Sequence, residues 1–337
     1  MGRVFYDQDI QLDPLMGKTA AVIGYGNQGR SQALNMRDSG LSVIVGNPED
    51  AYSAQAAEDG MSVFSIEEAV KGADVIMLII PDEAQAAVYQ QSIAPNLKPG
   101  ACLIFSHGFN IFYHILEPPD TIDVALVAPR MLGFGVRTRY LSGEGFPTLV
   151  AVDHDATGTA WARTLAIAKA IGGARKGAWE TSFEEETVID LFGEQVGGGS
   201  TLAATINSFE TLVEAGYDPD VVLLELYASG EMIEVMRSVV EHGLLGSLKY
   251  HSPTSQYGQM SRARRLVPQA AKENLRTVLN EIQDGTFARE WQAEGEAGYQ
   301  NMERLRANFS EHYMFTVEKR VHESLNPPDN QSSESED

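Results

Sequence analysis

The stretch Lys18-Thr19-Ala20-Ala21-Val22-Ile23-Gly24-Tyr25-Gly26-Asn27-Gln28-Gly29 decides the fold of the first half of the chain. Residues 20–23 are apolar and predict a short strand, and residues 30–36 have a helical pattern. A second strand is predicted at 41–45. A G-x-G-x-x-G sequence between a strand and a helix is typical of a dinucleotide-binding unit. The candidate cofactor-binding residues of this motif are Gly24, Tyr25, Gly26, Asn27, Gln28 and Gly29.

The three glycines of such a motif have different functions. The first makes a tight turn, the second lets the backbone approach the pyrophosphate, and the third lets the helix pack closely on the sheet. The N-terminus of the helix then faces the phosphates with the positive end of its dipole. Glycine-rich turns are common, but here the flanking strand and helix agree with the dinucleotide interpretation.

More strands alternate with helical patterns along the first half. Strands are predicted at 74–80, 101–105, 124–127 and 148–152, and helices at about 66–72 and 83–92. This alternation predicts an α/β fold with a mostly parallel, doubly wound sheet. Ligands bind at the carboxyl ends of the strands in such folds. Those ends carry Pro81-Asp82-Glu83, Ser106-His107-Gly108 and Pro129-Arg130.

The loop after the second strand bears on the choice between NAD and NADP. It carries Glu49 and Asp50 and has no lysine or arginine. Carboxylates at this position bind ribose hydroxyls, whereas a 2′-phosphate calls for a cation. We therefore expect NAD rather than NADP. The alternative is that Pro48-Glu49-Asp50 is only a helix-capping turn.

The second half of the chain, after about residue 180, has helical patterns only. Asp190 and Glu194 are four residues apart and share one face of a predicted helix. They stand among apolar residues, which predicts burial, and buried carboxylates without a cation are costly. Such a pair suits a hard cation such as Mg²⁺. A later predicted helix, about 219–242, contains Glu225, Glu231 and Glu234, of which at least one fits an ordinary surface glutamate.

Composition limits the function classes. The net charge of −22, with Arg262, Arg264 and Arg265 as the one dense basic cluster, argues against nucleic-acid binding. No run reaches the ~18–20 apolar residues of a membrane span, and no signal-peptide core is visible. The single cysteine excludes an intrachain disulfide. We expect a cytoplasmic protein of about two domains, with a disordered tail at 326–337.

The chain resembles the ketol-acid reductoisomerase family from Val4-Phe5-Tyr6-Asp7 to about Gly298. Beside the glycine motif, the resemblance rests on Pro81-Asp82-Glu83-Ala84-Gln85, His107-Gly108-Phe109-Asn110-Ile111, Val127-Ala128-Pro129, Glu180-Thr181-Ser182-Phe183, Glu184-Glu185-Glu186-Thr187, Asp190-Leu191-Phe192-Gly193-Glu194-Gln195 and 209–217. It implies the short form of the family, with a Rossmann domain at 1–181 and an all-helical, knotted domain at 182–325. It also implies a homodimer with intertwined helical domains, or a higher assembly of dimers.

The resemblance further implies an activity and its residues. The family converts a 2-acetohydroxy acid into a 2,3-dihydroxy acid for branched-chain amino-acid synthesis, by Mg²⁺-assisted alkyl migration and hydride transfer from a nicotinamide cofactor. Two Mg²⁺ ions would use about four carboxylates. The metal ligands implied here are Asp190, Glu194 and Glu231, the last from the partner subunit. Catalytic positions are these three with His107, Arg130 and the substrate-binding Ser252. Cofactor positions are Ser53, Asp82, Gln85, His107 and Gly133, beside Glu49, Asp50 and the glycine motif.

The chain departs from the family pattern at two positions that bear on isomerisation and in the stretch Met131-Leu132-Gly133-Phe134-Gly135, which is more apolar than the family's. Tyr227 stands where the family has a further metal-binding glutamate, and a phenol is a poor Mg²⁺ ligand. Arg130 stands where the family has a lysine, and arginine cannot relay a proton. The main hypothesis is a working reductoisomerase. The alternative is a paralogue that only reduces a related 2-keto acid, ketone or imine. A third hypothesis is a cofactor-binding subunit or sensor without catalysis.

Overall fold

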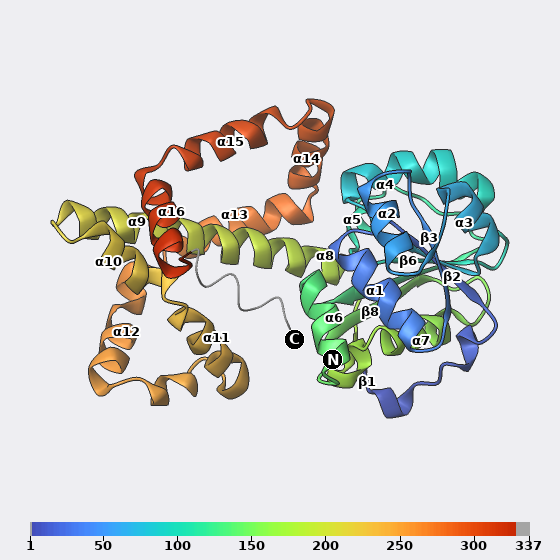
Figure 1. Cartoon of the computed structure of the whole chain (residues 1–337), viewed down its shortest axis with the longest axis horizontal. Coiled ribbons are helices and arrows are strands. Elements are labelled where there is room, and N and C mark those ends of the chain that lie inside the picture. Colours follow the sequence, from blue (N-terminus) through green and yellow to red (C-terminus); the bar gives the residue numbers. More distant parts are fainter. Residues whose placement is uncertain (1, 328–337) are drawn as a thin grey trace. The chain divides into compact units, whose positions relative to one another are not determined.

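The computed structural model describes residues 2–327. The chain divides into two compact units, Met1–Asp190 and Leu191–Asp337 (Figure 1). The predicted boundary between 181 and 182 lies earlier in the chain than this division. Most of the predicted disordered tail lies outside the described residues.

Unit 1 contains a nine-stranded sheet in the order β1-β9-β8-β7-β6-β5-β2-β3-β4. The strands are β1 Val4–Phe5, β2 Thr19–Ile23, β3 Ser42–Gly46, β4 Ser62–Phe64, β5 Val75–Leu78, β6 Cys102–Phe105, β7 Asp123–Pro129, β8 Thr148–His154 and β9 Ala178–Glu180. Neighbouring strands run parallel except in the pairs β7–β8 and β1–β9. The strand order reverses between β2 and β5, the position where doubly wound sheets bind ligands. The α/β prediction is confirmed.

Helices cover both faces of this sheet (Figure 1). They are α1 Asn27–Asp38, α2 Ala51–Glu58, α3 Ile66–Gly72, α4 Asp82–Val88, α5 Phe109–Phe112, α6 Gly133–Leu141, α7 Ala160–Ala170 and α8 Phe183–Phe192, with the π-helical η3 Tyr89–Ile93 and short 3₁₀ turns at Asp7–Asp9, Asp13–Leu15, Ala94–Asn96 and Gly173–Lys176. Each face of the sheet packs its own apolar cluster, one around Val22 and Ile104 and the other around Ile23 and Leu103. The central strands are buried on both sides, so they read as continuous apolar runs.

Cys102 belongs to this core. It stands at the start of β6 and is fully buried as a free thiol. Burial, with the charge of Asp123, raises the pKa of the thiol to about 12. The side chain therefore behaves as a small apolar residue.

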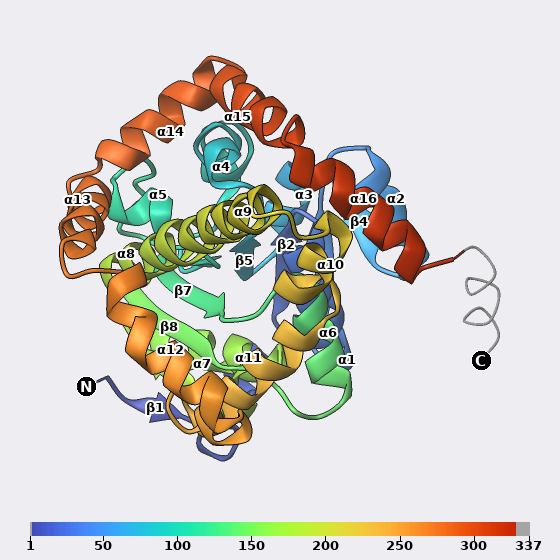
Figure 2. The same cartoon turned by 90° about the vertical axis from the view of Figure 1, so that its left-hand side faces the viewer.

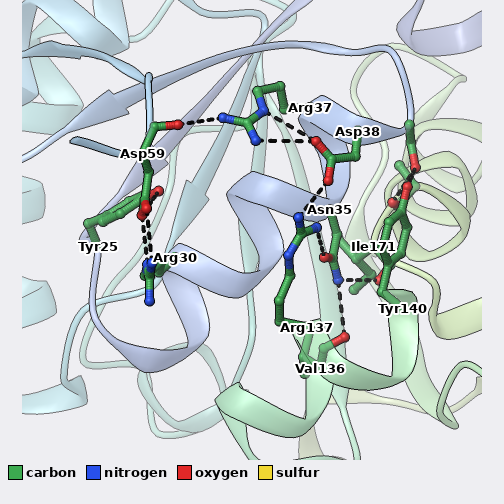
Figure 3. Close-up of polar contacts among 12 residues, drawn as sticks. Tyr25, Arg30, Asn35, Arg37, Asp38, Asp59, Val136, Arg137, Tyr140 and Ile171 are labelled. Atoms are coloured by element: carbon green, nitrogen blue, oxygen red, sulfur yellow. Dashed lines mark hydrogen bonds and ion pairs between the residues drawn. The ribbon is translucent and has the colours of Figure 1, made fainter. Parts of the chain in front are cut away.

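Polar contacts fix both ends of α1 (Figure 3). At its start, Asp59 accepts hydrogen bonds from the Tyr25 hydroxyl at 3.0 Å and from Arg30 Nε at 2.6 Å. Toward its end, Arg137 donates to Asn35 and Asp38, at 2.8 and 2.6 Å. The helix that starts within the glycine motif is thus held by Asp59, just after α2, and by Arg137 of α6.

Unit 2 is helical throughout its described residues. Its elements are η6 Gly193–Gly198, α9 Gly199–Glu214, α10 Pro219–Leu223, η7 Leu224–Ala228, α11 Glu231–His242, η8 Ser247–Tyr250, α12 Pro253–Leu266, α13 Ala271–Gln283, α14 Thr286–Glu296, α15 Gln300–Ser310 and α16 Tyr313–Leu325 (Figure 2). Its small core lies between α9, α10 and α16, around Phe209, Leu223 and Val317. Across residues 2–327, no helix has the length and apolar character that crossing a bilayer requires.

The single helix predicted at about 219–242 is wrong. The chain forms α10, then the π-helical η7, and restarts as α11 after Gly230. Gly230 has φ +80°, a left-handed conformation that ends a helix and that glycine adopts without strain. Glu225 and Glu231 therefore belong to different helices.

Candidate functional site

The glycine motif forms an open backbone cradle at the start of α1. Gly24 has φ +95°, and a Cβ atom there would lie 2.6 Å from the carbonyl oxygen of Ile79. A Cβ atom on Gly29 would lie 2.1 Å from the carbonyl oxygen of Gly24. At Gly26 no atom lies within 4 Å of the equivalent position. The backbone is therefore bare at Gly26, beside free helix N–H groups, as phosphate binding requires.

Other side chains of the motif are engaged within the protein. Tyr25 is 2% exposed, and its hydroxyl is bonded to Asp59, so this side chain is buried and engaged within the protein. Gln28 Nε2 donates to the carbonyl oxygen of Met131 at 2.8 Å. A Cβ atom on Gly133 would lie 2.4 Å from the carbonyl oxygen of Asn27. These contacts seat the 131–133 segment directly on the motif.

A cavity of about 540 Å³ opens beside the ends of β3 and β4. Its lining includes Glu49, Ser53, Glu67 and Glu68, and no lysine or arginine. Asp50, by contrast, caps α2: its carboxylate accepts hydrogen bonds from the backbone N–H groups of Tyr52 and Ser53, and from the Asn47 side chain. The capping alternative therefore describes Asp50, while Glu49 lines the cavity.

A charged cluster gathers at the carboxyl ends of the central strands. We call Asp82, His107, Arg130, Glu186 and Asp190 the Arg130 cluster. Asp82 opens α4, His107 follows β6, Arg130 follows β7, and the last two stand on α8. Arg130 Nη2 lies 2.8 Å from Glu186 Oε1, and Nη1 lies 2.5 Å from Asp190 Oδ1. The planar guanidinium thus holds two carboxylates one helical turn apart.

Glu186 is the buried member of the cluster. Its side chain is fully buried, and its Oε2 accepts a hydrogen bond from the backbone N–H of Gly108 at 2.8 Å. Burial raises the pKa of this carboxyl, against the opposing charges of His107 and Arg130. A Cβ atom on Gly108 would lie 2.5 Å from Thr187 Oγ1, so glycine allows the segment between β6 and α5 to approach α8.

His107 stands between two carboxylates. Its Nδ1 lies 2.7 Å from Asp82 Oδ2, and its Nε2 lies 3.6 Å from Asp190 Oδ2. Burial lowers the pKa of the imidazole, but the hydrogen bond and charge of Asp82 outweigh it and raise the pKa to about 9. Nε2 is buried and has no hydrogen-bond partner among the described residues. This nitrogen is free to act on a bound molecule.

Asp82 is itself held by a buried amide pair. Gln85 is 3% exposed, and its Nε2 donates to Asp82 Oδ1 at 3.2 Å. Asn110 donates to Gln85 Oε1 and to the carbonyl oxygen of Asp82, at 3.0 and 2.9 Å. Gln85 thus acts within the protein, behind Asp82.

The family pattern implies two Mg²⁺ ions here, and the donor atoms present fit one of them. His107, Glu186 and Asp190 each offer a ligand atom, and these atoms lie within 4.8 Å of one another. Asp190 is 28% exposed in its side chain, and its Oδ2 is not bonded to Arg130. One divalent cation therefore fits at Asp190. Arg130 already binds the other carboxylate oxygen of Asp190, Oδ1, and Oε1 of Glu186.

The remaining predicted residues lie in unit 2. Glu194 and Glu231 are exposed, so the expected burial of Glu194 is wrong. Glu194 stands in the π-helical η6, where the neighbouring glycines have no side chains that could shield its carboxylate from solvent. Ser252 caps α12, and its Oγ accepts a hydrogen bond from the N–H of Ser255 at 3.2 Å. The Tyr227 hydroxyl donates to Glu318 of α16.

Two residues of this site were not predicted. They are Glu186 and Asn110. Glu186 stands four residues before Asp190, the same spacing that related Asp190 to Glu194, so the sequence did contain a signal for it. Asn110 lay within a quoted motif, but nothing local shows that it reaches Gln85. Its role depends on the packing of α5 against α4.

Fold and cradle together define the class of protein. A doubly wound sheet with a bare glycine turn at the start of α1, at the point where strand order reverses, is the architecture of a dinucleotide-binding protein.

Comparison with known proteins gives the family. Residues 14–177 match the family model "Acetohydroxy acid isomeroreductase, NADPH-binding domain", and residues 183–326 match "Ketol-acid reductoisomerase, C-terminal domain". The chain is 45% identical to a ketol-acid reductoisomerase (NADP(+)) of Saccharopolyspora erythraea, over 94% of this chain and 96% of that one. It is 44% identical to that of Methanocaldococcus jannaschii, over 95% and 97%.

A solved structure agrees. An NADH-preferring ketol-acid reductoisomerase from an uncultured archaeon superposes with a TM-score of 0.91 at 36% identity, covering 95% of this chain and 98% of that one. The chain belongs to the ketol-acid reductoisomerase family, whose members are nicotinamide-dependent oxidoreductases. The family, the α/β first domain and the helical second domain expected from the sequence are confirmed. The knot in the helical domain stays a prediction.

Proposed function

We propose that the chain converts a 2-acetohydroxy acid into a 2,3-dihydroxy acid, as its relatives' name implies, in branched-chain amino-acid synthesis. The observation that carries this proposal is the Arg130 cluster beside the glycine cradle in unit 1. A hydride donor bound on the cradle would place its nicotinamide toward the ends of β5, β6 and β7, where the cluster stands.

The cofactor preference follows from the adenosine side of the cradle. The cavity beside β3 presents Glu49, Glu67 and Glu68, so an additional phosphate would meet negative charge. Ribose hydroxyls would instead donate to Glu49. NADH is the proposed reductant. The named relatives include both NADP(+) enzymes and an NADH-preferring one.

Each polar residue has a proposed function. Asp190 and Glu194, with Glu231 of the partner subunit, would hold Mg²⁺, which when bound polarises the substrate carbonyl and stabilises an alkoxide. His107 holds a proton at Nε2 and faces Asp190, and Asp82 fixes the orientation of its ring. Ser252 would donate its hydroxyl to the substrate carboxylate. Arg130 keeps a fixed positive charge beside Asp190.

We also propose a homodimer with intertwined helical units, or an assembly of such dimers. Met232, Ile233, Met236 and Val240 follow a helical spacing on α11 and are 51–85% exposed. Leu244 and Leu245, just beyond, are 76% and 75% exposed. A continuous apolar face of this kind is characteristic of a protein interface, and a second copy of this chain is its proposed partner.

The test of the reaction is direct. Purified protein receives 2-acetolactate with NADH or NADPH, with and without Mg²⁺, and the product is identified by mass spectrometry. A Mg²⁺-dependent dihydroxy acid supports the proposal. The second candidate is reduction without isomerisation, which Tyr227 and Arg130 favour. Turnover of only the already migrated 2-keto acid, a ketone or an imine would select this candidate. Binding of cofactor without any turnover would favour a sensor.

A further inference from the structure

Arg130 places a positive charge between the carboxylates of Glu186 and Asp190. Its two Nη atoms hold Glu186 and Asp190 at 2.8 and 2.5 Å, and its side chain is 29% exposed. An arginine cannot lose its proton in a protein, so this charge is permanent. Its fork also matches two carboxylates at once, which a lysine ammonium cannot do with the same geometry.

The ligand atoms around Arg130 are close enough to hold an ion in its absence. Those of His107, Glu186 and Asp190 lie within 4.8 Å of one another, and His107 would join them once its imidazole has lost a proton. The guanidinium and a divalent cation would therefore compete for the same two carboxylates. Like charges at this separation repel, most strongly where water is excluded, and Glu186 is fully buried.

Tyr227 stands where the family pattern has a metal-binding glutamate, and it is a poor ligand for Mg²⁺. Tyr227 supplies a phenol, and its hydroxyl donates to Glu318 within unit 2. Burial, with the bond to Glu318, raises the pKa of this phenol above its ordinary value. The hydroxyl thus stays protonated and engaged, and offers no anionic oxygen to a cation.

We infer that this chain binds one divalent cation at Asp190, and that the Arg130 guanidinium supplies the fixed positive charge of a second one. The inference rests on the proposed function for the identity of the metal site. The geometry supports the rest: Arg130 binds Asp190 Oδ1 and Glu186 Oε1. Asp190 Oδ2 is not bonded to Arg130 and lies 3.6 Å from His107 Nε2, so the ion would take this oxygen in competition with the imidazolium. A lysine in the place of Arg130 would also carry a positive charge, but its single ammonium group would not hold both carboxylates with the same geometry.

The experiment counts bound ions without catalysis. Metal-free full-length protein is titrated with Mn²⁺ alone, and free Mn²⁺ is measured by electron paramagnetic resonance. Salt is kept high enough to screen the acidic surface, and Asp190→Asn identifies ions bound elsewhere. We expect one Asp190-dependent ion per chain. Arg130→Gln is expected to bind two, and their mutual spin coupling should broaden the bound spectrum.

Arg137→Gln is the matched control, since Arg137 also bridges α6 to acceptors, Asn35 and Asp38, away from the cluster. It should keep one ion. The additional change Glu186→Gln in the Arg130→Gln protein should remove the second ion. Two Asp190-dependent ions in the unaltered protein would overturn the inference, even if Arg130→Gln failed to fold. So would a folded Arg130→Gln protein that still binds one.

Failure of the proposed function has a different signature. It would appear as absence of dihydroxy acid from 2-acetolactate while the Mn²⁺ count stays at one. A count of two with normal product formation would instead leave the proposed function standing and overturn the role of Arg130.

Discussion

The Nδ1 atom of His107 lies 2.7 Å from the Oδ2 atom of Asp82, and this contact sets the charge of the imidazole. Burial opposes protonation, so the raised pKa, about 9, depends on the carboxylate. Asp82→Asn keeps the shape and removes the charge. We expect the pKa of His107 to fall by more than about one unit. A histidine proton NMR titration of metal-free protein measures it, and an unchanged pKa would contradict this electrostatic account.

The same contact predicts how stability depends on pH. The pKa of His107 is higher in the folded protein, about 9, than the ordinary value of 6.5. Its stabilising contribution is therefore complete below pH ~6.5 and is lost as the pH rises through about 9. The loss should be on the order of 3 kcal/mol. Urea unfolding in EDTA across this range should show a decline that His107→Gln lacks. Parallel slopes in the two proteins would count against it.

Glu49 and Asp50 can be separated by mutation. Glu49→Arg should shift the kcat/KM ratio toward NADPH by at least about ten-fold, because a cation replaces a carboxylate beside the ribose. Asp50→Ala should instead cost about 1 kcal/mol of stability by removing the cap of α2. It should change the cofactor ratio little. Steady-state kinetics and thermal unfolding of both variants test this, and a preference that follows Asp50 would refute the assignment to Glu49.

Tyr227 donates a hydrogen bond to Glu318, so replacing Tyr227 alone should affect stability in a way that depends on Glu318. Tyr227→Glu would place a second carboxylate against Glu318, so we expect destabilisation by about 1–3 kcal/mol. Glu318→Gln in the same protein should recover most of it, because the repulsion disappears. Tyr227→Phe is the control for the lost hydrogen bond alone. Urea unfolding measures all three, and a Tyr227→Glu protein as stable as the original would rule out the pairing.

Two glycines of the cradle predict opposite effects. Gly29→Ala drives a Cβ atom to 2.1 Å from the carbonyl oxygen of Gly24, and should lower stability by more than about 2 kcal/mol. Gly26→Ala meets nothing within 4 Å, so its stability should hardly change. It should weaken dinucleotide binding at least about ten-fold, because the methyl group stands where the phosphates approach. Calorimetric titration with NADH and thermal unfolding distinguish the two effects.

The sequence predicted what local pattern controls. The long buried strands were visible as apolar runs, and the glycine turn as a motif, because each depends on a few consecutive residues. The short strands β1, β4 and β9 were missed, since two or three residues carry little periodicity and pair only through the finished sheet. The break at Gly230 was missed because a single glycine is tolerated inside many helices.

The site shows the same division. His107, Arg130 and Asp190 were identified individually, but the order of contacts among them was not. Arg130 and Glu186 are 56 residues apart, and only the neighbouring positions of β7 and α8 bring them together. Likewise, the sequence gives no sign that Tyr227 meets Glu318, 91 residues away.

The isolation of the thiol of Cys102 has a practical consequence. Maleimide and nitroxide reagents attack thiolates at the surface, so they should pass over this residue in the folded protein. Any cysteine introduced elsewhere would then be labelled alone, without first removing the native one. A spin label at Val240→Cys, on the exposed face of α11, would give a dipolar signal between two labels only where two copies of the chain come together.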